Sequence, residues 1–187
     1  AFDECTSPTE DLKYQAEALE RTHRWAERSL VEHRKLINLV VEPPSGGSTT
    51  KFFAPALFGI VQGGRDENLR KKSATFIGAL DFDGFGIGGS FAKEDMSSAV
   101  KWVNEILPEN KPRHLLGIGE PEDIFMGIEN GVDLFDCVAP TRNARNGSLY
   151  TKNGKINILN KEYRTDFGPI EEGCGCVACK QFSKSYL

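Results

Sequence analysis

Short apolar runs alternate with helical segments through the middle of this chain, and this alternation constrains the fold most. The runs have the length and the bounded ends of buried strands: LFGIV at 57–61, FDGFGI at 82–87, RHLLGI at 113–118 and VDLF at 132–135. Apolar residues with helical spacing follow the first three runs, at 69–80, 96–107 and 121–131. Strands that alternate with helices form parallel sheets, so we expect an α/β fold, either doubly wound or closed as a barrel.

The N-terminal region adds a further strand, a long helix and a linker. We expect FDEC, residues 2–5, to end a fifth strand ahead of the helix. The sequence Ser7-Pro8-Thr9-Glu10 combines a capping box with a proline suited to the first helical turn, and it predicts a helix that runs to about Leu36. The segment EPPSGGSTTK, residues 42–51, has the composition of a linker.

Acidic, amide and glycine residues stand at the carboxyl ends of these five expected strands. In chain order they are Asp3, Gln62, Gly88–Gly89, Gly117–Gly119 and Asp136. In α/β barrels this edge carries the ligands and the chemistry. A single glycine here more often only shapes a turn, but five such strand ends together predict a site for a flat ligand, with acids and amides that read its edge.

The bulk composition fits a chain with a core of its own and no membrane span. The 187 residues are 39% hydrophobic, and no apolar run reaches the length of a transmembrane helix. The N-terminus has neither a signal peptide nor an initiator methionine, so we expect an excised piece of a longer cytoplasmic protein.

The net charge of −4 is unevenly distributed. From Arg142 to Arg164 six basic residues face one acid, so this segment carries +5 and the remainder −9. An anionic partner that binds at one place would explain this basic segment, and a solvated loop and hairpin would explain it equally well. We expect a polar loop after Pro140, then a β-hairpin with a type I′ turn at Asn153-Gly154.

Three of the five cysteines crowd into the sequence Cys174-x-Cys176-x2-Cys179. Thiolates at this spacing are typical of a zinc site in a reducing compartment. We expect Cys5 and Cys137 to be packing residues, and His23, His33 and His114 to be surface or core residues and not ligands.

Together these segments resemble the queuine/guanine tRNA-ribosyltransferases, the tRNA-guanine transglycosylases. The resemblance runs over almost the whole chain, on FDCVAPTRNARNG, GIVQGG, FGIGGS, LLGIGEPED and CGCVACKQFSKSYL. It implies a (β/α)8 TIM-type barrel, partial in this chain over residues 1–147, followed by a β-hairpin and a truncated zinc-binding subdomain over 148–187. The implied enzyme is a pentosyltransferase that exchanges the wobble guanine of tRNA anticodons for a 7-deazaguanine, preQ1 or queuine, and it commonly works as a homodimer.

The resemblance also implies the roles of individual residues. Asp136 matches the aspartate nucleophile, which forms a covalent intermediate with the ribose. The base is recognised by Asp3, Gln62 and the backbone of Gly89, and it is flanked by Gly117. Anticodon nucleotides of the tRNA contact Arg142, Asn143 and Arg145. The ligands of Zn²⁺ match Cys174, Cys176 and Cys179, with a histidine outside this chain as the fourth.

The sequence departs from the family pattern in three places. The acid/base aspartate and the fourth zinc ligand are expected before Ala1 and after Leu187, and Ser90 replaces the leucine usual in bacterial relatives beside the base. Three alternatives therefore stay open: a non-catalytic tRNA-binding subunit of the same family, a metabolic α/β-barrel enzyme for a small ligand, and a folded piece without activity.

Overall fold

The computed structural model describes residues 1–40, 55–89 and 92–187. Contacts divide the chain into two compact units, Ala1–Cys137 and Val138–Leu187, which we call the N-terminal and C-terminal units. The expected domain boundary between residues 147 and 148 stays a prediction. The expected linker at 42–51 and the departure at Ser90 lie outside the described residues.

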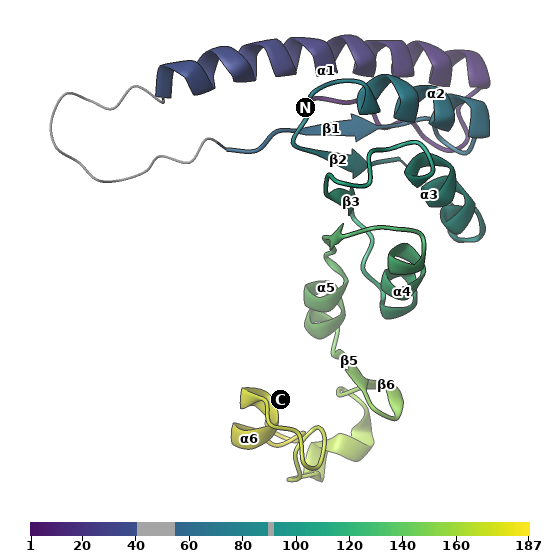
Figure 1. The fold of residues 1–187 in the computed structure, drawn as a ribbon. Helices are drawn as coiled ribbons and strands as arrows, with labels where there is room; N and C mark the ends of the chain where they lie inside the picture. The colour runs from purple at the N-terminus through teal and green to yellow at the C-terminus, as the bar shows by residue number, and fades with distance from the viewer. Residues whose placement is uncertain (41–54, 90–91) are drawn as a thin grey trace, which may run out of the picture. The chain divides into compact units, whose positions relative to one another are not determined.

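A four-stranded parallel sheet forms the centre of the N-terminal unit, as the alternation predicts (Figure 1). Its strands are β1 (Phe58–Val61), β2 (Gly84–Ile87), β3 (Arg113–Leu115) and β4 (Leu134–Phe135). They pair in sequence order, each parallel to the next. The α/β class with a parallel sheet is therefore confirmed.

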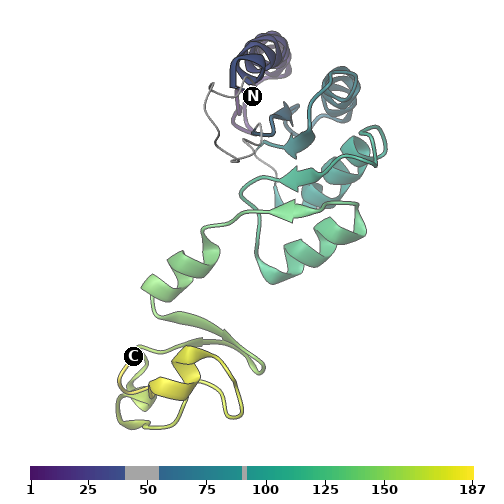
Figure 2. The same ribbon diagram turned by 60° about the vertical axis from the view of Figure 1, so that its left-hand side comes forward.

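Helices connect these strands and lie together on one side of the sheet (Figure 2). They are α2 (Glu67–Gly78), α3 (Met96–Asn104) behind the 3₁₀ turn η1 (Lys93–Asp95), and α4 (Pro121–Glu129). Parallel strands that follow one another in order need crossovers of one hand, and such crossovers put every helix on the same face.

Two of these helices end on residues that are suited to helix termini. Asp66 caps α2 by accepting a hydrogen bond from Leu69 N (2.8 Å). Gly131 follows α4 with a φ of 83°, and its N–H bonds to the Ile128 carbonyl (3.0 Å), which is typical of a glycine at a helix C-terminus.

The long helix α1 (Leu12–Val40) begins later than predicted and also ends later. The expected capping box is not formed, because Pro8 to Glu10 lie in a turn in which Glu10 N bonds to the Ser7 carbonyl (3.2 Å). Asp11 serves as the cap instead, since its carboxylate accepts from Tyr14 N (2.7 Å). The buried face of α1 has helical spacing: Gln15, Ala18, Leu19, Thr22, His23, Ala26 and Leu30.

The expected strand at residues 2–5 is wrong, because these residues form neither strand nor helix. Side-chain contacts with α1 hold them in place of a strand ladder. The Glu4 carboxylate accepts from Arg21 Nε (2.6 Å) and from the Tyr14 hydroxyl (2.8 Å), and the Glu4 N–H donates to Thr22 Oγ1 (3.0 Å). The Arg21 hydrogen bonds and that of Tyr14 lower the pKa of Glu4 to about 2.

The hydrophobic core lies between the sheet and its helices. Fully buried strand residues such as Val61, Phe85 and Leu115 meet Ile77 of α2 and Val100 of α3. Each of these side chains has an exposure of 0%. His23 of α1 joins this layer and stacks on Phe76 with ring centroids 4.2 Å apart, which confirms its interpretation as a core residue.

The C-terminal unit contains small elements only. These are α5 (Ala139–Arg145), β5 (Ser148–Thr151), β6 (Gly154–Asn157), the 3₁₀ helix η2 (Lys161–Thr165) and α6 (Val177–Gln181). The polar loop expected after Pro140 is wrong, because this segment forms α5. Proline is compatible with the first turn of a helix, where no carbonyl lies four residues earlier within the helix.

The β-hairpin is confirmed, but its turn differs from the prediction. Strand register pairs Thr151 with Gly154, so Lys152 and Asn153 form the two-residue connection. Gly154 has a φ of 108°, and no non-glycine residue in the described structure has a positive φ, which excludes a type I′ turn at Asn153-Gly154.

Among the described residues no helix is long and apolar enough to cross a membrane.

Candidate active-site edge and metal centre

The sheet register places several predicted site residues on one face of the sheet. It aligns one residue of each strand: Ile60, Gly86, His114 and Leu134. Side chains alternate along a strand, so positions two residues further on lie on the same face. At the carboxyl edge these positions are Gln62, Gly88, Leu116 and Asp136. The parallel strands therefore bring residues from distant parts of the sequence to one edge.

Asp3 and Gln62 contact each other directly. Gln62 Nε2 donates to Asp3 Oδ2 over 2.6 Å, and Gln62 is only 4% exposed. The Gln62 backbone N–H donates to Ser73 Oγ of α2 (3.2 Å), so its main chain is also held. A carboxylate and an amide fixed side by side present acceptors and donors to the edge of a planar ring.

Gly89 lies beside this pair and has a backbone conformation that suits glycine. Its φ is 113°, and a Cβ built on it would come within 3.1 Å of Gln62 Oε1 and 2.4 Å of Arg70 Nη2. A side chain here would clash with Arg70 Nη2 and crowd Gln62 Oε1, and the positive φ also favours glycine. The structure thus brings Asp3, Gln62 and Gly89 together, as the sequence predicts for a base site.

Asp136 follows β4 and presents an exposed carboxylate. Its side chain is 61% exposed, and its Oδ1 accepts from the backbone N–H of Gly117 (3.0 Å). His114 Nε2 lies 2.9 Å from the same oxygen, an ion-pair distance without the angle of a hydrogen bond. Both neighbours therefore contact Oδ1. Among the described residues none donates a hydrogen bond to Oδ2, and the carboxylate stays accessible to a substrate.

His114 lies at the candidate site, although the sequence analysis did not include it there. It was expected to be a surface or core residue, yet it lies against Asp136. The signal was present in the register, because His114 pairs with Leu134 and Asp136 stands two residues beyond Leu134 on the same face. Only knowledge of which strands are neighbours turns this spacing into a contact.

In the C-terminal unit, the three predicted RNA-contacting residues lie on α5. Arg142 and Arg145 are exposed. The Asn143 side chain is tied to the hairpin, since its Nδ2 donates to the Tyr150 hydroxyl (3.4 Å) and its Oδ1 accepts from Lys155 Nζ (3.3 Å). Lys155 also lies over the Tyr150 ring, 5.1 Å from its centroid. The helix and the hairpin thus form one basic surface with an aromatic ring.

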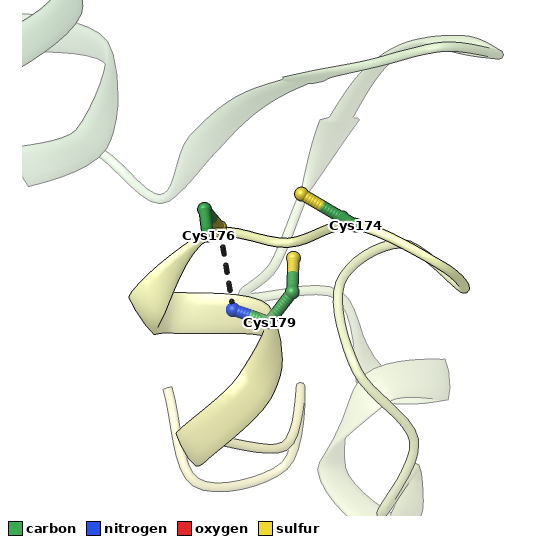
Figure 3. A group of neighbouring side chains, drawn as sticks. All are labelled: Cys174, Cys176 and Cys179. Atoms are coloured by element: carbon green, nitrogen blue, oxygen red, sulfur yellow. Dashed lines mark hydrogen bonds between the residues drawn. The ribbon is translucent and has the colours of Figure 1, made fainter.

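The three clustered cysteines converge in the C-terminal unit (Figure 3). Their sulfur atoms all lie within 4.8 Å of one another. Four ligands at about 2.3 Å around a tetrahedral zinc ion are separated by about 3.8 Å, so these thiols are close to the spacing that zinc requires. Among the described residues, no fourth histidine, cysteine or carboxylate joins the group.

Local hydrogen bonding favours the ligand form of one of these thiols. Cys176 precedes α6, and its sulfur accepts from the backbone N–H of Cys179 (3.4 Å; dashed in Figure 3). This hydrogen bond, with those of the neighbouring thiols, lowers the pKa of Cys176. Since zinc binds thiolates, the cluster fits three of the four positions of a closed structural site.

The whole of this chain is similar to a group of tRNA-modifying proteins. A family model described as queuine tRNA-ribosyltransferase matches residues 1–187. A putative queuine tRNA-ribosyltransferase of Archaeoglobus fulgidus is 46% identical over all of this chain and 45% of its own length. Queuine tRNA-ribosyltransferases of Lawsonia intracellularis (46% identical, 47% of its length) and Bacillus licheniformis (43%, 46% of its length) also match the whole chain. The chain spans about half the length of these curated relatives.

Proposed function

Because this chain belongs to the queuine tRNA-ribosyltransferase family, we propose that the whole protein is a tRNA-guanine transglycosylase. It exchanges the wobble guanine of tRNA anticodons for a 7-deazaguanine, either preQ1 or queuine. The observation that carries this proposal is the accessible carboxylate of Asp136, which is held through Oδ1 at the carboxyl edge of the sheet. The Asp3–Gln62 pair lies at the same edge. The four ordered parallel strands are the corresponding part of a (β/α)8 barrel.

In this proposal Asp136 is the nucleophile. Its free oxygen, Oδ2, attacks C1′ of the ribose, the bond from C1′ to the base breaks, and the electron pair leaves with guanine, which takes up a proton from another acid. The ribose is then held covalently on the carboxylate. N9 of the incoming base attacks C1′ and gives its proton to the base form of the same acid, and the C1′–Oδ2 bond breaks and regenerates the carboxylate. Gly117 and His114 orient the carboxylate by contacting Oδ1, which leaves Oδ2 to react.

Asp3, Gln62 and Gly89 recognise the base. The Asp3 carboxylate accepts from N1–H and the 2-amino group of guanine. The Gln62 amide has two N–H donors, of which one binds Asp3 and the other is available for O6 of the base. Adenine lacks this pattern and would leave buried polar groups unpaired, so such a site rejects it.

The C-terminal unit binds RNA and a metal ion. Arg142, Asn143 and Arg145 contact anticodon nucleotides, which must be splayed apart for the target base to reach the sheet edge. Zn²⁺ bound by Cys174, Cys176 and Cys179, with a histidine as fourth ligand, would fix the fold of this unit. We further expect domains at 1–147 and 148–187, a cytoplasmic location and a homodimer.

The direct test is incorporation of labelled guanine into tRNA by the full-length protein, beside its Asp136→Asn variant. The parent should incorporate label, while the variant loses at least about a thousandfold in rate because an amide cannot replace the attacking carboxylate. The variant should bind tRNA nearly as well as the parent. If neither protein incorporates label but both bind tRNA, the chain is a non-catalytic subunit of the same family.

A further inference from the structure

Arg70 is a fully buried charged residue to which the proposed mechanism gives no role. It lies in α2 on the side that meets the sheet, and its exposure is 0%. Burial lowers the pKa of its guanidinium to about 9, which still leaves the group charged at neutral pH. Buried charges are expensive and contribute little net stability, so a fully buried arginine in this place points to a task in positioning.

The guanidinium connects two turns at the carboxyl edge of the sheet. Its Nε donates to the carbonyl of Gly64, which follows β1, and its Nη1 donates to the carbonyl of Gly88, which follows β2. The two distances are 2.8 and 2.6 Å. Hydrogen bonds from a charged donor are stronger than those between neutral groups. The planar fork of one side chain therefore fixes the separation of two backbone segments.

These two segments carry the residues that face the proposed base. Gln62 stands two residues before Gly64, and Gly89 directly follows Gly88. Both turns contain a glycine with a positive φ, 55° at Gly64 and 113° at Gly89. Arg70 Nη2 closes the space beside Gly89, because a Cβ built there would lie 2.4 Å away. Any shift of the guanidinium would therefore shift both turns.

We propose that Arg70 is a positioning residue for base recognition, which holds the Gly64 and Gly88 carbonyls so that Gln62 and the Gly89 backbone meet the O6 side of the purine. This inference rests on the proposed function. Arginine is needed because lysine has a single ammonium group without the planar fork. The effect is on affinity for the base and not on the attack by Asp136.

The test compares guanine exchange by the full-length parent with Arg70→Lys and Arg70→Met. A matched control is Lys71→Met, which removes an exposed cation from the next position of the same helix. For Arg70→Lys, the KM for guanine should rise about tenfold, while kcat changes less than about threefold. Arg70→Met should be worse, and Lys71→Met should match the parent. A merely structural role would lower the active fraction, and thus kcat, at an unchanged KM.

A second probe separates the O6 side from the rest of the base. 2-Aminopurine lacks the O6 oxygen and the N1–H and keeps the 2-amino group, so it makes no contact on the O6 side. Its inhibition constant should therefore change by less than about twofold in Arg70→Lys. If guanine and 2-aminopurine weaken equally, or if the KM for guanine is unchanged, the inference is overturned. If the parent itself exchanges no guanine, the proposed function fails instead.

The parent offers a test that does not depend on a folded variant. In protein labelled with ¹⁵N-arginine, the Nε–H proton of Arg70 should exchange slowly with solvent, with and without bound guanine, because it is buried and bonded to Gly64. Rapid exchange in both states, as expected of a surface arginine, would contradict the proposed clamp.

Discussion

The two units of this chain are stabilised in different ways. The N-terminal unit has a continuous apolar core between its sheet and helices, with many side chains that are fully buried. In residues 138–187, all of which the structure describes, no hydrophobic side chain is buried. That unit contains a two-stranded hairpin, polar contacts such as Lys184 Nζ to Asp166 Oδ2 (2.8 Å), and the cysteine cluster that could hold a metal ion. Small domains without a core commonly need a metal ion.

The units also differ in charge. Residues 138–187 contain eight lysines and arginines and four acids, a net charge of +4. The remaining 15 basic and 23 acidic residues give residues 1–137 a net charge of −8. Under the proposed function, this difference gives the attraction for RNA to the basic unit and the chemistry to the acidic one. Variants in one unit should therefore change a different observable from variants in the other.

The largest effect is expected from the metal site. Cys176→Ser in the full-length protein should release zinc, measured as metal content, and unfold the C-terminal unit, measured as protease sensitivity after residue 137. Structural zinc sites contribute about 10 kcal/mol or more to folding, far more than other contacts of this unit. Cys137→Ser lies outside the cluster and should keep the metal. Stoichiometric zinc in Cys176→Ser would remove this residue from the ligand set.

A core substitution should destabilise the N-terminal unit and leave the metal site of the C-terminal unit unchanged. Phe85→Ala should lower the free energy of unfolding of the N-terminal unit by about 3–5 kcal/mol, because Phe85 is 0% exposed and a cavity would remain. Phe85→Leu keeps most of the apolar volume and should cost less. Denaturant unfolding checks both variants, and zinc content should equal that of the parent. Loss of zinc in Phe85→Ala would show that the two units fold together.

His114→Gln should lower kcat about tenfold, since the Asp136 carboxylate would lose one of the two contacts to Oδ1, which corresponds to about 1.4 kcal/mol. The Kd for tRNA should not change. The matched control is His33→Gln, the same substitution in α1. Steady-state guanine exchange measures the effect, and a kcat within twofold of the parent would mean that Gly117 alone orients the carboxylate.

The smallest effect is expected from Arg145→Ala. Its Kd for the anticodon stem-loop should rise about three- to tenfold at low salt. If Arg145 binds a phosphate, the slope of log Kd against log salt concentration should be smaller than that of the parent by somewhat less than one. The deficit should shrink as salt increases, because the parent loses affinity faster than the variant. Lys101→Ala removes a cation from the N-terminal unit and should bind RNA like the parent. An unchanged affinity in Arg145→Ala would favour a solvated surface.

The sequence predicts the strands and helices in which buried residues recur at regular spacing. The strands around Phe85 and Leu115 and the helices that follow them are visible because apolar residues recur with strand or helix spacing. It failed where contacts with other segments decide the structure. Residues 2–5 look like a strand, but the ion pair from Glu4 to Arg21 holds them against α1 as coil.

The candidate site was predicted to a similar extent. The residues at strand ends were visible, and the structure gathers Asp3, Gln62 and Gly89 as expected. Arg70 and His114 were not found, because each acts across the sheet edge on residues 18 and 22 positions away, Gly88 and Asp136. Neither contact can be read from spacing along the chain before the strand order is known.

In the proposed mechanism Asp136 attacks C1′ of the ribose. The most direct test of this step is to mix the full-length protein with anticodon stem-loop RNA, quench in denaturant, digest both components, and locate the ribose adduct by mass spectrometry. We predict an adduct on the peptide that contains Asp136 and none in Asp136→Asn. An adduct on another residue, or exchange activity retained in Asp136→Asn, would contradict the account.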